Sequence, residues 1–135
     1  MDQNLYQCVK SMTAAEASCN EGGVIIICAE CADGHGGEGF YRSLKDCRSA
    51  DELYAQFMAT HQDKTLPDQW ESQILARILI HHTVIFVSRP EMKNIIEDMK
   101  MCYASSLDEA INMAKHREKK SMTVIPNGIS VIVKS

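Results

Sequence analysis

Three polar side chains of different chemistry are spaced to share one face of a helix near the start of the chain. The pattern of residues 3–19 predicts that helix, and its buried stripe is expected to be Leu5, Val9 and Met12. Tyr6 lies four residues before Lys10 and Gln7 lies three before it, so the three side chains are neighbours. A phenol, an amide and an ammonium group together suit a small carboxylate. The alternative is that they are ordinary polar residues on a helix surface.

A second candidate binding residue is Trp70, the only tryptophan of the chain. It falls in the first turn of a helix that is predicted to begin at Pro67 and Asp68. A lone tryptophan usually packs in the core, but at a helix start beside a cleft it can form one wall of a ligand site. His81 and His82 are expected to end the same helix. Adjacent residues on a helix point apart, so this pair makes a poor metal site.

A glycine-rich loop, DGHGGEG at residues 33–39, follows the first predicted strand. Its amides could cradle an anion, because a helix is expected to begin where the loop ends. It matches neither the dinucleotide fingerprint nor the P-loop. The alternative is a strand-to-helix turn that needs positive φ angles, with His35 as an exposed or backbone-bonded loop residue.

The six cysteines include one C-x-x-C motif, formed by Cys28 and Cys31. A structural zinc site would need a second pair at a suitable spacing, and none follows. A thiol redox site favours a first cysteine at a helix N-terminus, whereas Cys28 is expected to close a strand. Six cysteines without a visible secretory signal favour reduced thiols and a cytoplasmic location.

The elements that position these residues alternate short apolar runs with capped helices. The predicted helices are residues 3–19 (capped by Asp2), 38–46, 49–60, 67–82, 88–100 and 106–119, and S-x-x-E capping boxes start those at Ser49, Ser88 and Ser106. The predicted strands are residues 24–28, 83–87 and 101–104, with one or two more in MTVIP and ISVIV around the turn Pro126–Gly128. This alternation predicts an α/β fold with a mostly parallel sheet and helices on both faces, a doubly wound, Rossmann-like three-layer arrangement. Residues 1–135 are expected to form a single domain.

Composition excludes several classes of protein. A net charge of −4 argues against a nucleic-acid partner, because phosphate binding needs a basic surface. The sequence contains no apolar run of about 18 residues, so no membrane span is expected.

Several motifs, in order along the whole chain, resemble one family. DQNLYQCVK, MTAAEA, EGGVIIICAECADGHGGEGFY, PDQWESQILARIL, VIFVS and MTVIPNG are similar to the C-terminal half of nickel-dependent lactate racemases. The resemblance implies a two-domain α/β protein whose N-terminal domain carries a nickel-pincer nucleotide and the catalytic histidines. It also implies chemistry in which hydride leaves the 2-carbon of a 2-hydroxy acid and returns to either face.

The resemblance implies a role for four residues of this chain. Lys10 would pair with the substrate carboxylate, Tyr6 and Gln7 would line the same pocket, and Trp70 would form an aromatic wall. No catalytic or metal-binding residue is assigned to this chain, and we expect it to be an excised domain or truncated product that is inactive alone. Its expected partners are an N-terminal cofactor-binding domain and a small 2-hydroxy acid. The alternative from another class is a stand-alone, non-catalytic module that binds a small carboxylate or docks onto a separate catalytic protein.

Overall fold

Three parallel strands form the centre of the molecule. The computed structural model describes residues 2–117 and 121–130. Within them, β1 (Val24–Cys28), β2 (Thr83–Val87) and β3 (Cys102–Ala104) lie in the order β1-β2-β3, and every pairing is parallel. All three strands were predicted from their apolar runs, and the parallel sheet is confirmed. β1 is an edge strand of this sheet. The loop that follows it can therefore contact the helix α1 (Leu5–Glu16) beside that edge.

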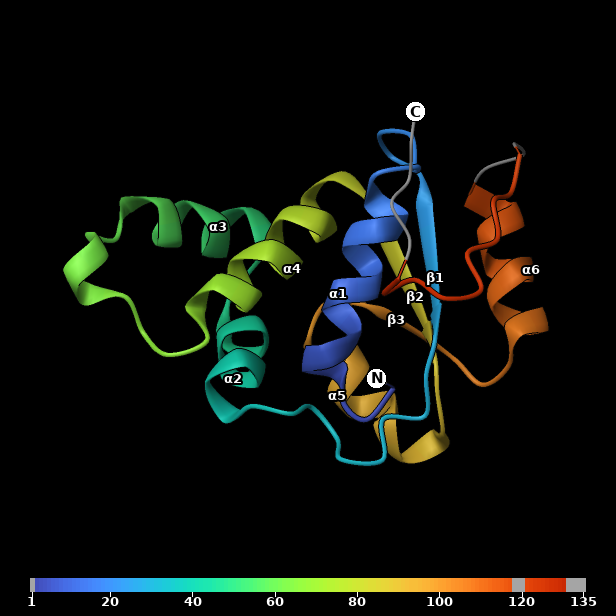
Figure 1. Cartoon of the computed structure of the whole chain (residues 1–135), viewed down its shortest axis with the longest axis horizontal. Helices are drawn as coiled ribbons and strands as arrows, with labels where there is room; N and C mark the ends of the chain where they lie inside the picture. The colour runs from blue at the N-terminus through green and yellow to red at the C-terminus, as the bar shows by residue number, and fades with distance from the viewer. Residues whose placement is uncertain (1, 118–120, 131–135) are drawn as a thin grey trace.

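Helices cover both faces of the sheet, as predicted. Ile25, Ile27 and Phe86 point to one face and belong to the larger core, which is shared with α1 (Leu5–Glu16), α4 (Gln69–His81) and α5 (Lys93–Asp98). Ile85 and Ala104 point to the other face, where they pack on α6 (Leu107–Arg117). Figure 1 shows α6 alone on one side of the strands and the other helices opposite. Burial of each large aliphatic or aromatic side chain in such a core contributes roughly 1.5–3 kcal/mol.

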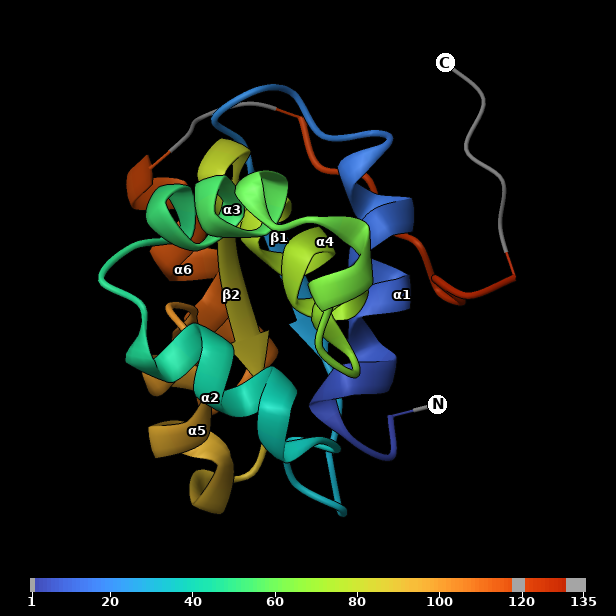
Figure 2. The ribbon, with the colours of Figure 1, turned by 90° about the vertical axis from the view of Figure 1, so that its left-hand side faces the viewer.

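The crossover from β1 to β2 contains half of the helices in the described residues. It consists of α2 (Glu38–Asp46), α3 (Ala50–Ala59), the short 3₁₀ helix η1 (Gln62–Lys64) and α4. Helix α3 packs on α4, and Figure 1 shows the α3–η1 part at the end of the molecule away from the sheet, the end that faces the viewer in Figure 2. None of the helices in the described residues combines the length and apolar character that crossing a bilayer requires.

Two of the predicted helix caps, Ser49 and Ser106, are confirmed, and two, Asp2 and Ser88, are not. Ser49 accepts a hydrogen bond from Glu52 N and Ser106 accepts one from Glu109 N, as expected for capping boxes. The first helix is capped by Asn4, whose Oδ1 accepts from Gln7 N at 3.0 Å, so the prediction of Asp2 was wrong.

Ser88 is likewise not a helix cap. Its hydroxyl donates to the carbonyl of Glu30 at 3.0 Å, which ties the end of β2 to the loop after β1. The chain then forms a 3₁₀ turn, η2 (Pro90–Met92), before α5, and α5 ends at Asp98 rather than near Lys100.

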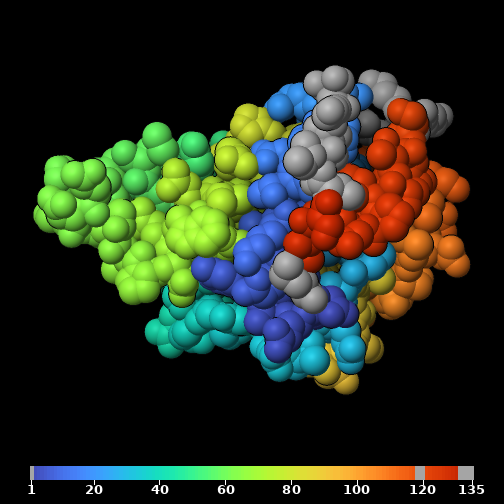
Figure 3. All heavy atoms as spheres, in the orientation of Figure 1, coloured from blue at the N-terminus to red at the C-terminus, as the bar shows by residue number. Residues whose placement is uncertain are grey.

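The end of the chain differs most from the prediction. Residues 121–125 form no strand, so the MTVIP prediction was wrong, while the turn that begins at Pro126 is present. These residues lie over α1 and β1 instead of joining the sheet (Figure 3), and a Cβ atom built on Gly128 would come within 3.0 Å of the Ser11 side chain. An apolar segment can be accommodated by covering a groove as well as by strand pairing. Most of ISVIV, and residues 118 and 119 of the last predicted helix, lie outside the described residues.

Candidate functional site

The glycine-rich loop holds the first turn of α1. Leu5 N donates to Gly34 O at 3.0 Å and Tyr6 N donates to His35 O at 3.1 Å. The first amides of a helix have no partner within the helix, so these carbonyls satisfy groups that would otherwise need water. The loop therefore fixes where α1 begins and, through α1, where Tyr6, Gln7 and Lys10 lie.

Several amides of the same loop are used within the protein, so they do not contribute to the anion cradle considered from the sequence. Three of its amides donate within the protein: Asp33 N to Gln3 O, Gly34 N to Cys31 O, and Gly37 N to His35 Nδ1. The positive φ angles of Gly34 (68°) and Gly36 (81°) explain the glycines. The structure thus agrees with the strand-to-helix turn, in which His35 is bonded to the backbone and stacked on Tyr41 with ring centroids 4.8 Å apart.

Gln7 and Lys10 are joined on the exposed side of α1. Lys10 Nζ donates to Gln7 Oε1 at 2.8 Å, and the two residues are separated by one turn. Leu5, Val9 and Met12 are completely buried, as the stripe predicts, so the opposite side of the helix faces outward. Lys10 is exposed and its ammonium has two further hydrogens available for a ligand.

Tyr6 connects this helix to α4. Its hydroxyl donates to Asp68 Oδ1 at 3.2 Å, and Asp68 immediately precedes α4. The ring of Tyr6 meets the ring of Trp70 edge-on, with centroids 6.5 Å apart, and packs on Phe40 at 5.3 Å. Trp70 remains 55% exposed. The four predicted residues therefore form two contacting pairs, Tyr6 with Trp70 and Gln7 with Lys10, supported by adjacent residues of one helix.

Two acidic residues of this region were not identified from the sequence. Asp68 is the acceptor for Tyr6, and Glu71 lies in the first turn of α4 with only 1% of its surface exposed. Glu71 lies four residues before Leu75, on the buried stripe of α4, so helical spacing could have indicated its burial. An acidic residue in a first turn also fits the helix dipole, so the sequence alone does not distinguish a buried Glu71 from an exposed one.

The acidic residues perturb the titration of their neighbours. Burial raises the pKa of Tyr6, and the hydrogen bond to Asp68 and the charges of Asp68 and Glu71 act in the same direction. The phenol is therefore a hydrogen-bond donor at neutral pH. Burial also raises the pKa of Glu71, while the positive charge of Lys10 opposes that shift and Asp68 adds to it.

This arrangement has the chemistry of a small anion site with one strong positive group. Lys10 supplies the charge, Gln7 holds the ammonium, and the Trp70 ring offers an apolar wall nearby. Because Lys10 and Trp70 are both exposed, a ligand here would be covered only on the side of this chain. The arrangement is therefore open on its outer side.

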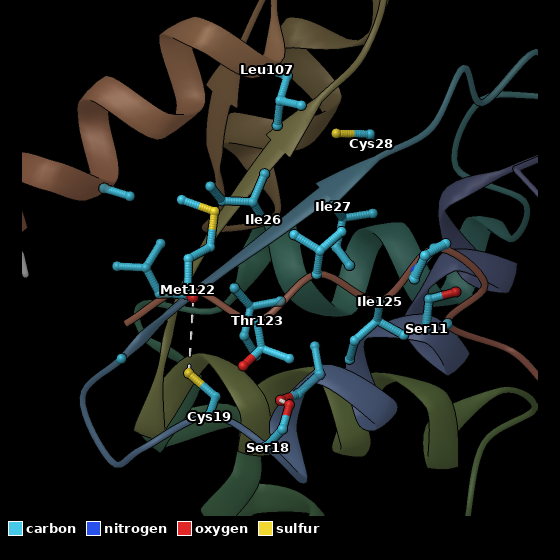
Figure 4. Close-up of a pocket in the computed structure, with 18 of the residues that line it drawn as sticks. Ser11, Ser18, Cys19, Ile26, Ile27, Cys28, Leu107, Met122, Thr123 and Ile125 are labelled. Carbon is cyan, nitrogen blue, oxygen red and sulfur yellow. Dashed lines mark hydrogen bonds between the residues drawn. The ribbon is translucent and has the colours of Figure 1, made fainter. Parts of the chain in front are cut away.

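A large groove of the described structure lies elsewhere. A groove of about 1120 Å³ runs between α1, β1, α6 and residues 121–129 (Figure 4). Ile26, Met122 and Ile125 line it, with Ser11 and Ser18 from α1 and the turn after it. A mainly aliphatic lining does not suit a small carboxylate, so this groove is not the candidate site.

The two cysteines of the C-x-x-C motif and the two adjacent histidines lie in different environments. Cys28 is exposed, whereas buried Cys31 lies 3.9 Å, sulfur to sulfur, from Cys8 rather than beside Cys28. His81 pairs with Glu21 at 2.7 Å, and His82 is buried at the end of α4. In the part of the chain that the structure describes, no three His, Cys, Asp or Glu side chains are grouped closely enough to hold a metal ion.

Comparison with known proteins relates the whole domain to one family. Residues 1–133 match the family model described as lactate racemase C-terminal domain. The chain is 52% identical to a lactate racemase of Thermoanaerobacterium thermosaccharolyticum and 53% identical to one of Lactiplantibacillus plantarum, with 99% of this chain covered in each. It spans 32% of the length of each relative. The structure of the lactate racemase apoprotein from T. thermosaccharolyticum is similar over 99% of this chain and 33% of that chain, with 51% identity and a TM-score of 0.97.

Proposed function

Because this chain belongs to the lactate racemase C-terminal domain family, we propose that it binds the substrate carboxylate of a 2-hydroxy acid racemase or epimerase. Lys10 pairs with the carboxylate in this proposal, Tyr6 and Gln7 line the pocket, and Trp70 forms its aromatic wall. The observation that carries the proposal is that Lys10 and Gln7 are held together at 2.8 Å on the same helix face as Tyr6, which packs against Trp70.

The proposed interactions act mainly through position. A charged hydrogen bond from Lys10 to a carboxylate contributes about 1.5–3 kcal/mol. Gln7 Oε1 limits the positions of the ammonium, so less side-chain entropy is lost when the substrate binds. Transfer of hydride requires near-contact geometry, and a carboxylate held at one end aligns the 2-carbon for it.

The remaining half of the pocket is proposed to come from an N-terminal cofactor-binding domain. The relatives are about three times as long as this chain, which leaves room for such a domain. In this proposal, the nickel-pincer nucleotide of the family is assigned to that N-terminal domain. No histidine of this chain is given a catalytic role, and the isolated chain is expected to be inactive.

Substitution of Lys10 tests this proposal in the intact protein that contains this chain. Lys10→Ala should raise KM for the 2-hydroxy acid by roughly tenfold or more, the equivalent of losing a charged hydrogen bond. Nickel content should be unchanged. Lys115→Ala, which removes an exposed lysine of α6 on the other sheet face, is the matched control and should leave KM unaltered. Loss of nickel in the Lys10 variant would contradict the assigned role.

The second candidate function is a non-catalytic module that binds a small carboxylate or docks onto a separate protein. The half-open site also permits this function, since Lys10 and Trp70 are accessible without another domain. The source gene distinguishes the two: an in-frame upstream region encoding a lysine- and histidine-bearing domain supports the enzyme, whereas translation that starts at Met1 supports the module. Tight stoichiometric nickel binding by this chain alone would overturn the proposed division between domains.

A further inference from the structure

Glu71 is a buried carboxyl group whose hydrogen bonds are not satisfied. Glu71 is 1% exposed, and neither of its carboxyl oxygens, Oε1 or Oε2, has a hydrogen-bond partner. By contrast, the neighbouring polar side chains have hydrogen-bond partners. Gln69 Oε1 accepts from Leu66 N, and the Ser72 hydroxyl donates to Asp68 O. An ionised carboxylate in such a place is strongly unfavourable unless a positive charge or a proton compensates it.

Lys10 is the positive charge that lowers the pKa of Glu71, but the two side chains do not form an ion pair in the structure. The ammonium is directed at Gln7 Oε1, and no ion pair joins Lys10 to Glu71 within 4.0 Å. The groups whose charge or titration is linked to Glu71 are Lys10 and Tyr6 from α1 and Asp68 from the turn before α4. Among them, only Lys10 favours the ionised form of Glu71, whereas burial and Asp68 favour the protonated form.

We propose that Glu71 is a positioning residue of the Lys10 site and that it takes up a proton when a carboxylate binds there. This proposal rests on the proposed function of Lys10. Without a ligand, the Lys10 ammonium stabilises the ionised form of Glu71. A bound carboxylate shares that ammonium and brings a second negative charge close to Glu71, and both effects favour protonation.

The step is balanced in atoms and charge. One ligand carboxylate and one proton from water enter a site that holds an ammonium and a carboxylate. The product holds the ammonium, the ligand carboxylate and a neutral glutamic acid. Neutral Glu71 no longer repels the ligand carboxylate, so the Lys10 ammonium attracts the ligand without an opposing negative charge at Glu71. Two carboxylates beside one cation share protons in the same way in other sites.

The first arm of the test needs no ligand. The Glu71 side chain is titrated by carbon-detected NMR in the 135-residue chain and in Lys10→Gln, which removes the ammonium but keeps a polar side chain. The Glu71 pKa should be higher in the variant. An unchanged Glu71 pKa overturns the coupling, whatever Lys10 does with substrate. This arm does not depend on a Glu71 variant folding.

The second arm measures KM against pH in the intact, cofactor-loaded protein. In the pH range where Glu71 must take up a proton for lactate to bind, the wild-type KM for lactate should rise by up to about tenfold per pH unit. Glu71→Gln, which mimics the neutral form, should flatten this rise, and kcat should change less than KM. A Glu71→Gln profile with the wild-type slope overturns the proposal. An exposed glutamate variant, Glu91→Gln, is the matched control and should keep the wild-type slope.

The two arms separate this inference from the function on which it rests. If Lys10→Ala leaves KM unchanged, the proposed carboxylate site is wrong, and the ligand-free titration still reports whether Lys10 and Glu71 are coupled. If Lys10→Ala raises KM but Glu71→Gln retains the wild-type slope, the carboxylate site stands and the role of Glu71 is rejected.

Discussion

A Cβ atom built on Gly36 would overlap the side-chain amide of Asn4, the residue that caps α1. The glycine-rich loop and the helix that carries Lys10 therefore fit together only because residue 36 has no side chain. The loop carbonyls of Gly34 and His35 complete this junction by accepting from the first amides of α1. The loop thus acts on the candidate site by positioning the helix.

Gly36→Ala should destabilise the chain more than Gly34→Ala. Both glycines have positive φ angles, which cost alanine roughly 1 kcal/mol, but open space surrounds Gly34. The Gly36 variant must also displace Asn4, and loss of a helix cap costs about 1 kcal/mol more. Urea denaturation of both variants measures the difference. Equal destabilisation would show that the Asn4 contact is unimportant.

Asp68→Asn should be tolerated better than Asp68→Ala. Asp68 has a φ of 62°, a conformation that asparagine adopts readily, and an asparagine oxygen can still accept from Tyr6. Alanine loses both advantages, so it should lower the free energy of unfolding by about 1–2 kcal/mol. The prediction is wrong if the two variants unfold at the same urea concentration. Trp70 fluorescence follows the unfolding, since it is the only tryptophan.

Asp98 should make stability depend on acid pH. The hydrogen bond from Tyr41 holds the pKa of Asp98 below its ordinary value of 3.8, and Lys45 and Lys100 act in the same direction. A lowered carboxyl pKa stabilises the fold above pH 3.8, and this contribution disappears as the pH falls through the folded-state value. Asp98→Asn should therefore be less stable than wild type near neutral pH, with the gap closing in acid. Thermal melts from pH 7 to pH 2 measure it, with Tyr41→Phe as the partner variant, and a constant gap would contradict the assignment.

Glu71→Gln should have the opposite pH dependence. The pKa of Glu71 is raised above its ordinary value of 4.5, so wild-type stability is complete below that pH and decreases as the pH rises through the folded-state value. The variant lacks this decrease and should be the more stable protein at pH 7, with similar stability at pH 4. Urea denaturation at the two pH values tests this. A variant less stable than wild type at pH 7 would indicate that ionised Glu71 has a partner.

Some of the fold and the site could be predicted because the deciding interactions are local. The β-branched run at 24–28 and the serines at positions 49 and 106 act within a few residues, and the structure has the expected strand and caps there. Ser88 fits the same local rule but donates to Glu30, 58 residues away. Sequence spacing cannot predict a hydrogen-bond partner that only the packing of the sheet brings close.

The sequence by itself determined which residues of α1 share a face, because helical spacing alone places Tyr6, Gln7 and Lys10 together. Only the tertiary structure decided what lies beneath that face. The packing of α1 on α4 brings Asp68 to Tyr6 and buries Glu71 near Lys10, across about 60 residues of chain. The hydrogen-bond donors of this site could be predicted from the sequence because they lie on one helix. The acidic groups that act on them could not, because burial and long-range charge arise only when the helices pack together.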